Sequence, residues 1–214
     1  MSYQFLKYEE LEHVAIITLN RPQKHNALSM ALREEITLCL EEIEKNEAVK
    51  VVILTGAGPS FCAGFDLKEF SDGNIDEIFA QATIYHHKVY NFSKPIIAAI
   101  NGSALAGGMD LAAMCDIRIA SEEASFGQPQ VQMGIIVAYD LIRAIIPEAI
   151  ARELCLTGRR ISSEEAKDIG LVNKIVPSER LIEEVINLGK LIAGNTAIQT
   201  TKGQFLQAQP KLFE

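Results

Sequence analysis

The chain has 214 residues, of which 48% are hydrophobic and 22% are charged, and its formal net charge is −8. This length fits one domain with a substantial core, and the composition excludes a disordered chain. The acidic balance argues against a nucleic-acid or anionic-membrane partner, because such surfaces need clustered Lys and Arg. Without a signal-like N-terminus or a long apolar run, we expect a cytoplasmic protein with no membrane contact.

Four short β-rich runs predict buried strands, and they cover residues 14–19, 51–54, 96–100 and 117–120. Between the first two, Ser29 opens a predicted helix. Its apolar stripe recurs every three or four residues, at Leu32, Ile36, Leu40 and Ile43.

Three further helices are predicted in chain order. One covers residues 75–91. Another follows the capping box at 162–165 and ends at Gly170, and the last opens at Ser178. Strands that alternate with helices indicate an α/β architecture.

Two segments, 50–66 and 94–110, share one arrangement: a buried-type strand, a loop of small residues with at least two glycines, and a helix start. Glycine lets the main chain approach a ligand closely. Two such loops can present two backbone N–H groups to the same space.

Several common motifs are absent. The segment from Gly56 begins like the dinucleotide-binding fingerprint but has Phe61 at the third glycine, and no phosphate-binding loop, zinc-protease or nucleophile-elbow motif is complete. The four cysteines form no Cys-x-x-Cys pair, which predicts neither a metal site nor a disulfide framework. His86 and His87 are expected on a helix surface.

Motifs at 20–28, 60–69, 101–111, 126–129 and 156–172 occur in an order and spacing that resembles the enoyl-CoA hydratase/isomerase (crotonase) superfamily, over about residues 10–200. The resemblance implies an α/β fold of the crotonase type, a spiral of ββα units. The family's helical tail usually supports trimers, and here it is expected to be short. We therefore expect a core over residues 1–195 and a truncated tail over 196–214.

The resemblance also implies an acyl-CoA thioester as substrate, with no metal or redox cofactor, and a homo-oligomer, trimeric or hexameric. The family's two oxyanion-binding N–H groups match Phe65 and Gly107. Developing negative charge on a thioester oxygen is stabilised by such donors. The residues implied on the CoA side are Lys24, Ala63, Phe65, Asp66, Leu67, Lys68 and Gly107.

The two glutamates of family hydratases are replaced by Asp110 and Gln130. Asp110 keeps a titratable carboxylate, or else makes a structural hydrogen bond at the helix start. Gln130 cannot act as an acid or base and can only hydrogen-bond. Asp140 is a further catalytic candidate, and its alternative role is to cap the following helix.

These replacements leave three functions open. The first is enoyl-CoA hydration or double-bond isomerisation, with a thioester enolate held in the oxyanion hole. The second is acyl-CoA hydrolysis or decarboxylation on the same hole. The third is a non-catalytic acyl-CoA-binding protein, since both glutamates are missing.

Overall fold

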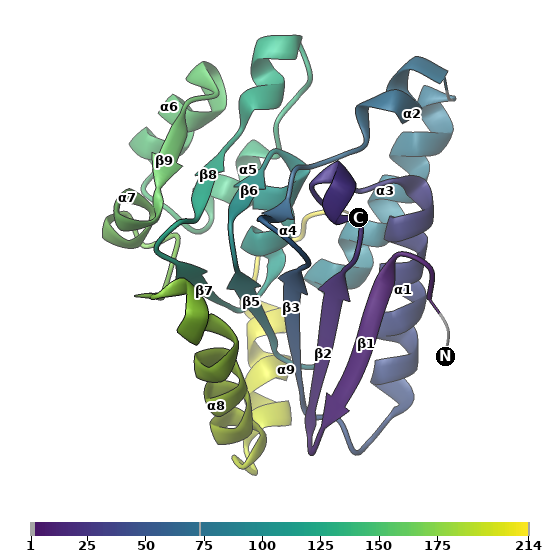
Figure 1. The fold of residues 1–214 in the computed structure, drawn as a ribbon, viewed down its shortest axis with the longest axis vertical. Helices are drawn as coiled ribbons and strands as arrows, with labels where there is room; N and C mark the ends of the chain where they lie inside the picture. Colours follow the sequence, from purple (N-terminus) through teal and green to yellow (C-terminus); the bar gives the residue numbers. More distant parts are fainter. Residues whose placement is uncertain (1–2, 73, 214) are drawn as a thin grey trace.

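The computed structural model describes residues 3–72 and 74–213 (Figure 1). Its strands are β1 Leu6–Leu11, β2 Val14–Leu19, β3 Val51–Gly56, β4 Ser60–Cys62, β5 Ile96–Ile100, β6 Ser103–Leu105, β7 Ile117–Ser121, β8 Ser125–Gly127, β9 Arg160–Ser162 and β10 Lys174–Val176. Its α-helices are α1 Met30–Lys45, α2 Leu67–Asp72, α3 Ile75–Tyr90, α4 Gly107–Met114, α5 Tyr139–Arg143, α6 Glu148–Thr157, α7 Ser163–Asp168, α8 Leu181–Ala193 and α9 Ile198–Ala208. Short 3-10 helices are η1 Pro22–Lys24, η2 Pro129–Met133 and η3 Ser178–Arg180.

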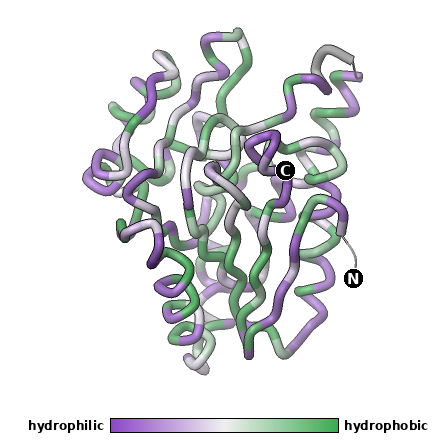
Figure 2. Tube along the Cα trace, in the orientation of Figure 1, coloured by the Kyte–Doolittle hydropathy of each residue, from purple (hydrophilic) through white to green (hydrophobic). Residues whose placement is uncertain are grey.

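The larger sheet has the order β1-β2-β3-β5-β7-β10 and is parallel except for the β1–β2 pair. Its central strands are hydrophobic on both faces (Figure 2), as expected for a sheet covered on both sides. Along β3, Val52 and Leu54 join the core under α1 and α4, whereas Val51 and Ile53 pack with α8. The period of two therefore divides one strand between two cores.

The smaller sheet has the order β4-β6-β8-β9 and is built from the loops that follow the long strands. Each of β3, β5 and β7 is followed by a short strand of this second sheet, namely β4, β6 and β8. Together with the helices after β4 and β6, this repeat is the spiral of ββα units. The α/β fold class is confirmed by this arrangement.

The predicted long strands and the first helices are confirmed. Ser29 caps α1, accepting from Leu32 N–H at 3.3 Å, and Ser162 caps α7, accepting from Glu165 N–H at 3.2 Å. Gly170 has φ +82° after α7, as the C′ position requires. The predicted helix start at Ser178 is confirmed: η3 begins there and leads directly into α8 at Leu181, and the Ser178 and Ser121 hydroxyls are hydrogen-bonded at 2.6 Å.

The last helix, α9, is tied to the core by a buried ion pair. Lys202 Nζ lies 2.7 and 2.9 Å from the two carboxylate oxygens of Asp116, and its side chain is 4% exposed. Beyond α9 the chain returns to α3, where Tyr90 donates to Pro210 O at 3.1 Å. Across the described residues, no helix combines the length and apolarity needed to cross a membrane.

Candidate active site

The first glycine-bearing loop is held in place by buried asparagine contacts. Asn26 is fully buried, and its Nδ2 lies 2.8–3.2 Å from the carbonyl oxygens of Ala57, Ser60 and Phe61. Leu28 N–H donates to Gly64 O at 2.8 Å. The motif at residues 20–28 thus positions the backbone that leads into Phe65.

The second loop carries a strained residue immediately before α4. Ala106 has φ +50° and ψ −128°, a conformation that residues other than glycine rarely adopt. Its carbonyl accepts from the N–H groups of Met109 and Asp110 at 2.9 and 3.1 Å. The N–H of Gly107 stands at the first position of α4, where no intrahelical acceptor exists, and Gly107 lines the cavity described below.

The two loops are in contact. A Cβ atom added to Gly64, which has φ +93°, would lie 3.0 Å from the Gly107 nitrogen and 2.8 Å from Ala106 Cβ. One added to Gly108 would lie 2.0 Å from Cys62 O. Only glycines allow the loops to approach this closely, which brings Phe65 and Gly107 to the same place.

Phe65 and Gly107 both line a cavity of about 290 Å³. Most of its walls are apolar, and its rim includes the half-exposed or exposed side chains of Leu67, Phe79 and Met133. The polar groups in its lining include those of Asp110, Gln130 and Arg160. The cavity therefore suits an apolar chain that carries one reactive polar group.

Asp110 is held by a chain of two buried amides. Gln128 donates to Asp110 Oδ1 at 2.7 Å, and Gln130 donates to Gln128 Oε1 at 2.5 Å. Burial raises the pKa of Asp110 to about 7, and the Gln128 hydrogen bond opposes this by favouring the carboxylate. Asp110 can therefore gain or lose a proton near neutral pH. Gln130 Oε1, buried and without a partner among the described residues, remains an acceptor.

The other predicted site residues lie elsewhere. Asp140 is in the first turn of α5, 63% exposed and paired with Arg143 at 2.8 Å, and it is not part of the cavity lining. The side-chain cap predicted for it is not formed, since α5 begins after Ala138. Asp140 thus lies apart from the cavity, and its catalytic role stays a prediction.

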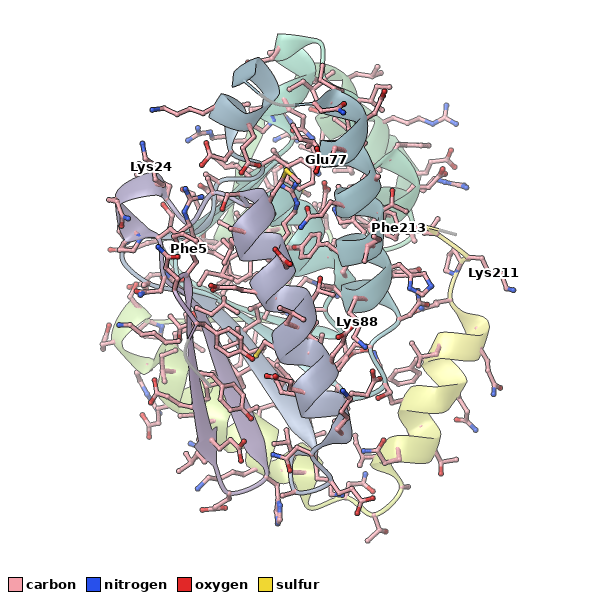
Figure 3. The ribbon with its side chains drawn as sticks, turned by 90° about the vertical axis from the view of Figure 1, so that its right-hand side faces the viewer. Phe5, Lys24, Glu77, Lys88, Lys211 and Phe213 are labelled. Atoms are coloured by element: carbon pink, nitrogen blue, oxygen red, sulfur yellow. The ribbon has the colours of Figure 1, made fainter. Side chains whose placement is uncertain are left out.

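The residues predicted on the CoA side divide into two groups. Ala63 and Leu67 line the cavity together with Phe65 and Gly107. Asp66 pairs with Arg21 at 2.9 Å, and Lys68 is exposed. Lys24 ends η1 and extends from the surface (Figure 3).

The sequence prediction for His86 was wrong. Its ring packs 5.8 Å from Phe65, 5.1 Å from Tyr85 and 4.9 Å from Phe213 between ring centroids, and Figure 3 places Phe213 beside α3. Burial lowers the pKa of His86 to about 4, so the imidazole is neutral at pH 7. His87 is exposed, as predicted.

Sequence reasoning also missed Gln128 and Arg33. Gln128 belongs to a motif, but nothing in its spacing indicates that it bridges Asp110 to Gln130. Arg33 adjoins the apolar stripe of α1, where a charged side chain is expected to reach solvent, yet it is fully buried. Its guanidinium lies 4.6 Å from the ring centroid of Phe65.

The chain is similar to known proteins in sequence and in fold. A model of the enoyl-CoA hydratase/isomerase family matches residues 9–210. The chain is 37% identical to a probable enoyl-CoA hydratase from Rhizobium meliloti, in an alignment that covers 100% of this chain and 90% of the relative. Among solved structures, an enoyl-CoA hydratase from Bacillus anthracis is similar, with a TM-score of 0.90, 38% identity and coverage of 96% and 85%. An enoyl-CoA hydratase subunit from Geobacillus kaustophilus gives a TM-score of 0.91 at 34% identity, with coverage of 97% and 84%.

Proposed function

The chain belongs to the enoyl-CoA hydratase/isomerase family, and on that premise we propose that it shifts the double bond of an enoyl-CoA thioester. The backbone N–H groups of Phe65 and Gly107 hold the thioester oxygen. Asp110 moves the proton between two carbons of the acyl chain. The observation that carries this proposal is a buried carboxylate, with a pKa raised to about 7, in the cavity that both loops line.

Removal of a proton beside a thioester places negative charge on its oxygen. Two fixed N–H donors stabilise that charge, and loss of one such donor typically costs about 2.7–4 kcal/mol of transition-state stabilisation. Gly107 is the first residue of α4, so the positive end of the helix dipole adds to the effect. The strain at Ala106 is consistent with a backbone held for this purpose.

Asp110 in its ionised form takes a proton from the α-carbon of a 3-enoyl thioester and leaves a dienolate in the oxyanion hole. The protonated acid then returns the proton to the γ-carbon, which gives the conjugated 2-enoyl thioester. No atom is added or lost, and the carboxylate is regenerated. A pKa near the working pH suits a group that must both accept and donate.

Isomerisation is favoured over hydration because hydration in this family uses two glutamates. Here the second matching position holds Gln130, which cannot exchange a proton. Gln130 Oε1 can accept a hydrogen bond in the cavity, so it can orient a bound group without taking part in proton transfer.

The test follows the ultraviolet absorbance of the conjugated thioester. With a 3-enoyl-CoA we expect absorbance to grow, and with a 2-enoyl-CoA we expect little loss from hydration. Asp110→Asn is the matched control, since it keeps the size and the hydrogen-bonding capacity of the side chain.

Other outcomes select between the remaining functions. Rapid loss of the 2-enoyl signal would indicate hydration instead. Release of free CoA thiol would indicate hydrolysis, and release of CO₂ from a carboxylated thioester would indicate decarboxylation. Thermal stabilisation by CoA esters without turnover of any of them would indicate a binding protein.

For the rest of the substrate we propose that Ala63, Leu67 and Lys68 lie along the CoA arm, with Lys24 on a phosphate. Lys24→Ala should then raise KM without lowering kcat. We also propose a cytoplasmic homo-oligomer, trimeric or hexameric, and sedimentation analysis of the purified chain gives its subunit number.

A further inference from the structure

A second polar group contacts the Phe65 ring through Arg33 and His86. Three of its buried atoms have no hydrogen-bond partner among the described residues: Arg33 Nη2, the Tyr85 hydroxyl and His86 Nε2. Arg33 comes from α1, and the other two come from α3. Unpaired buried polar atoms are rare, and three together call for an explanation such as an absent ligand.

The one ion pair that Arg33 forms within the described residues is long. Arg33 Nη1 donates to Leu28 O and its Nε to Gln81 Oε1, both at 2.6 Å, so both partners are neutral. The carboxylate of Glu69 lies 3.7 Å away, beyond hydrogen-bond distance. Both of its oxygens instead accept from Met30 N–H, at 2.9 and 3.0 Å. Burying a charge is costly unless it is closely paired.

The neighbours of Arg33 favour an anion. The lowered pKa of His86 makes it a neutral imidazole that can donate from Nε2, and burial raises the pKa of Tyr85, which keeps its hydroxyl as a donor. Guanidinium, hydroxyl and imidazole together offer three donors and one positive charge. This combination matches a carboxylate, which accepts several hydrogen bonds.

The cluster adjoins the cavity through Phe65. The Phe65 ring lines the cavity and contacts both Arg33, at 4.6 Å, and His86, at 5.8 Å between ring centroids. Asp110 lines the same cavity as Phe65. The Phe65 backbone is the proposed oxyanion donor. An acyl chain held there need pass only the Phe65 side chain to reach the cluster.

Resting on the proposed function, we infer that Arg33, Tyr85 and His86 bind a carboxylate at the far end of the acyl chain. The substrate class would then be the CoA thioester of a short dicarboxylic acid. The guanidinium supplies the counter-charge, and the Phe65 ring moves aside to admit the chain.

The test measures binding without turnover. Saturated thioesters matched in carbon number, glutaryl-CoA against pentanoyl-CoA and adipyl-CoA against hexanoyl-CoA, are titrated by calorimetry at neutral pH. Hydrogen bonds to charged groups are worth about 1.5–3 kcal/mol, so at least one carboxylate-ended thioester should bind about 10- to 100-fold tighter than its methyl-ended partner.

Two variants assign the preference to the cluster. Arg33→Met should abolish it, and Tyr85→Phe should reduce it while the remaining contacts stay in place. Arg33→Met also removes the ion pair with Glu69 and the donors to Leu28 O and Gln81 Oε1, so it should lose stability, and thermal unfolding checks that it folds. Tyr85→Phe removes only a hydroxyl and carries the test if Arg33→Met does not fold. Arg180→Met is the matched control, since Arg180 is exposed on η3 and should leave the preference unchanged.

The outcomes separate this inference from the proposed function. Equal affinity for both members of each matched pair would overturn the inference alone, as would a preference that survives in both Arg33→Met and Tyr85→Phe. If neither CoA nor any thioester binds, the proposed function is overturned, and this inference with it.

Discussion

Two polar groups adjoin Phe65, one in the cavity that it lines and one against its ring, and they differ in how fully their buried atoms are hydrogen-bonded. In the first, Gln128 joins Asp110 to Gln130, and among the described residues Gln130 Oε1 is the one fully buried side-chain atom of this group without a partner. The second, which contains Arg33, has three open atoms on three residues. A nearly satisfied group holds a reactive side chain in fixed geometry, whereas an unsatisfied one has capacity left for a ligand. The first suits proton transfer and the second suits recognition.

The largest expected effect is the loss of proton transfer in the first group. General acid–base catalysis contributes about 10²- to 10⁴-fold, so Asp110→Asn should lower kcat by at least about 100-fold and leave acyl-CoA affinity nearly unchanged. Steady-state kinetics and calorimetry measure the two quantities. Asp140→Asn serves as control and should retain activity. Unchanged turnover in Asp110→Asn would shift the assignment to Asp140 or to a binding protein.

The next largest fall in kcat is expected when one of the proposed oxyanion donors, Phe65 and Gly107, is displaced. Gly64→Ala places a Cβ atom 3.0 Å from the Gly107 nitrogen, which should displace that donor and lower kcat by about 10²- to 10³-fold. Gly170→Ala is a matched control, because Gly170 also has positive φ but has open space around its Cα. If the two substitutions reduce kcat equally, the oxyanion assignment fails.

The pH dependence tests the pKa of Asp110. If the carboxylate is the base, kcat/KM should rise as pH increases through about 7 and then level off. Gln128→Met removes a hydrogen bond that favours the charged form, so it should move this midpoint upward by about one pH unit. Gln132→Met, in the 3-10 helix η2 that Gln128 immediately precedes, changes an exposed glutamine and should not move the midpoint. An unshifted midpoint in Gln128→Met would show that Gln128 does not position or tune Asp110.

A stability measurement tests the direction of the same pKa shift. Folding raises the pKa of Asp110 from 3.8 to about 7, so the folded state holds the proton more tightly. The stability this provides is complete below about pH 3.8, falls as pH rises from there, and is lost above about pH 7. Thermal unfolding should therefore show that the stability of Asp110→Asn relative to the native chain increases as pH rises toward about 7. Above that pH the variant should be the more stable of the two. A constant difference at all pH values would contradict the raised pKa.

The smallest expected effect is a change in unfolding temperature at the strained residue Ala106. Ala106→Gly relieves the positive φ, and the strain released exceeds the entropy cost of glycine by about 1 kcal/mol. The unfolding temperature should rise slightly. Ala112→Gly, within α4, should lower it instead. A fall in both variants would mean that Ala106 is not strained.

Periodicity predicted the parts of the fold that repeat along the chain. The runs at 14–19 and 96–100 match β2 and β5 residue for residue, and the stripe on α1 is buried as expected. The three-residue strands β4, β6 and β8 fall within regions read as loops or left unassigned, since three residues carry no usable period. Their pairing depends on distant partners, which a single sequence does not reveal.

Sequence patterns predicted the part of the candidate site that the local glycine-bearing loops form. They missed the part that depends on side chains from distant segments. The two glycine-bearing loops have local spacing, and the family resemblance pointed to Phe65 and Gly107 within them; both line one cavity, and their role as oxyanion donors stays a prediction. His86 lies beside the buried stripe of α3 and is covered by Phe65 and Phe213, from remote segments. The Phe65 ring also lies against the guanidinium of the buried Arg33. No local pattern marks either residue.

Phe213 packs with a tilted ring against His86 and meets Tyr90 edge-on, so the last described residue of the chain helps to cover the group formed by Arg33, Tyr85 and His86. An affinity tag fused at the carboxyl terminus would emerge beside this contact and would compete for the space near His86. Purification for the calorimetric work should therefore rely on an amino-terminal tag that can be cleaved.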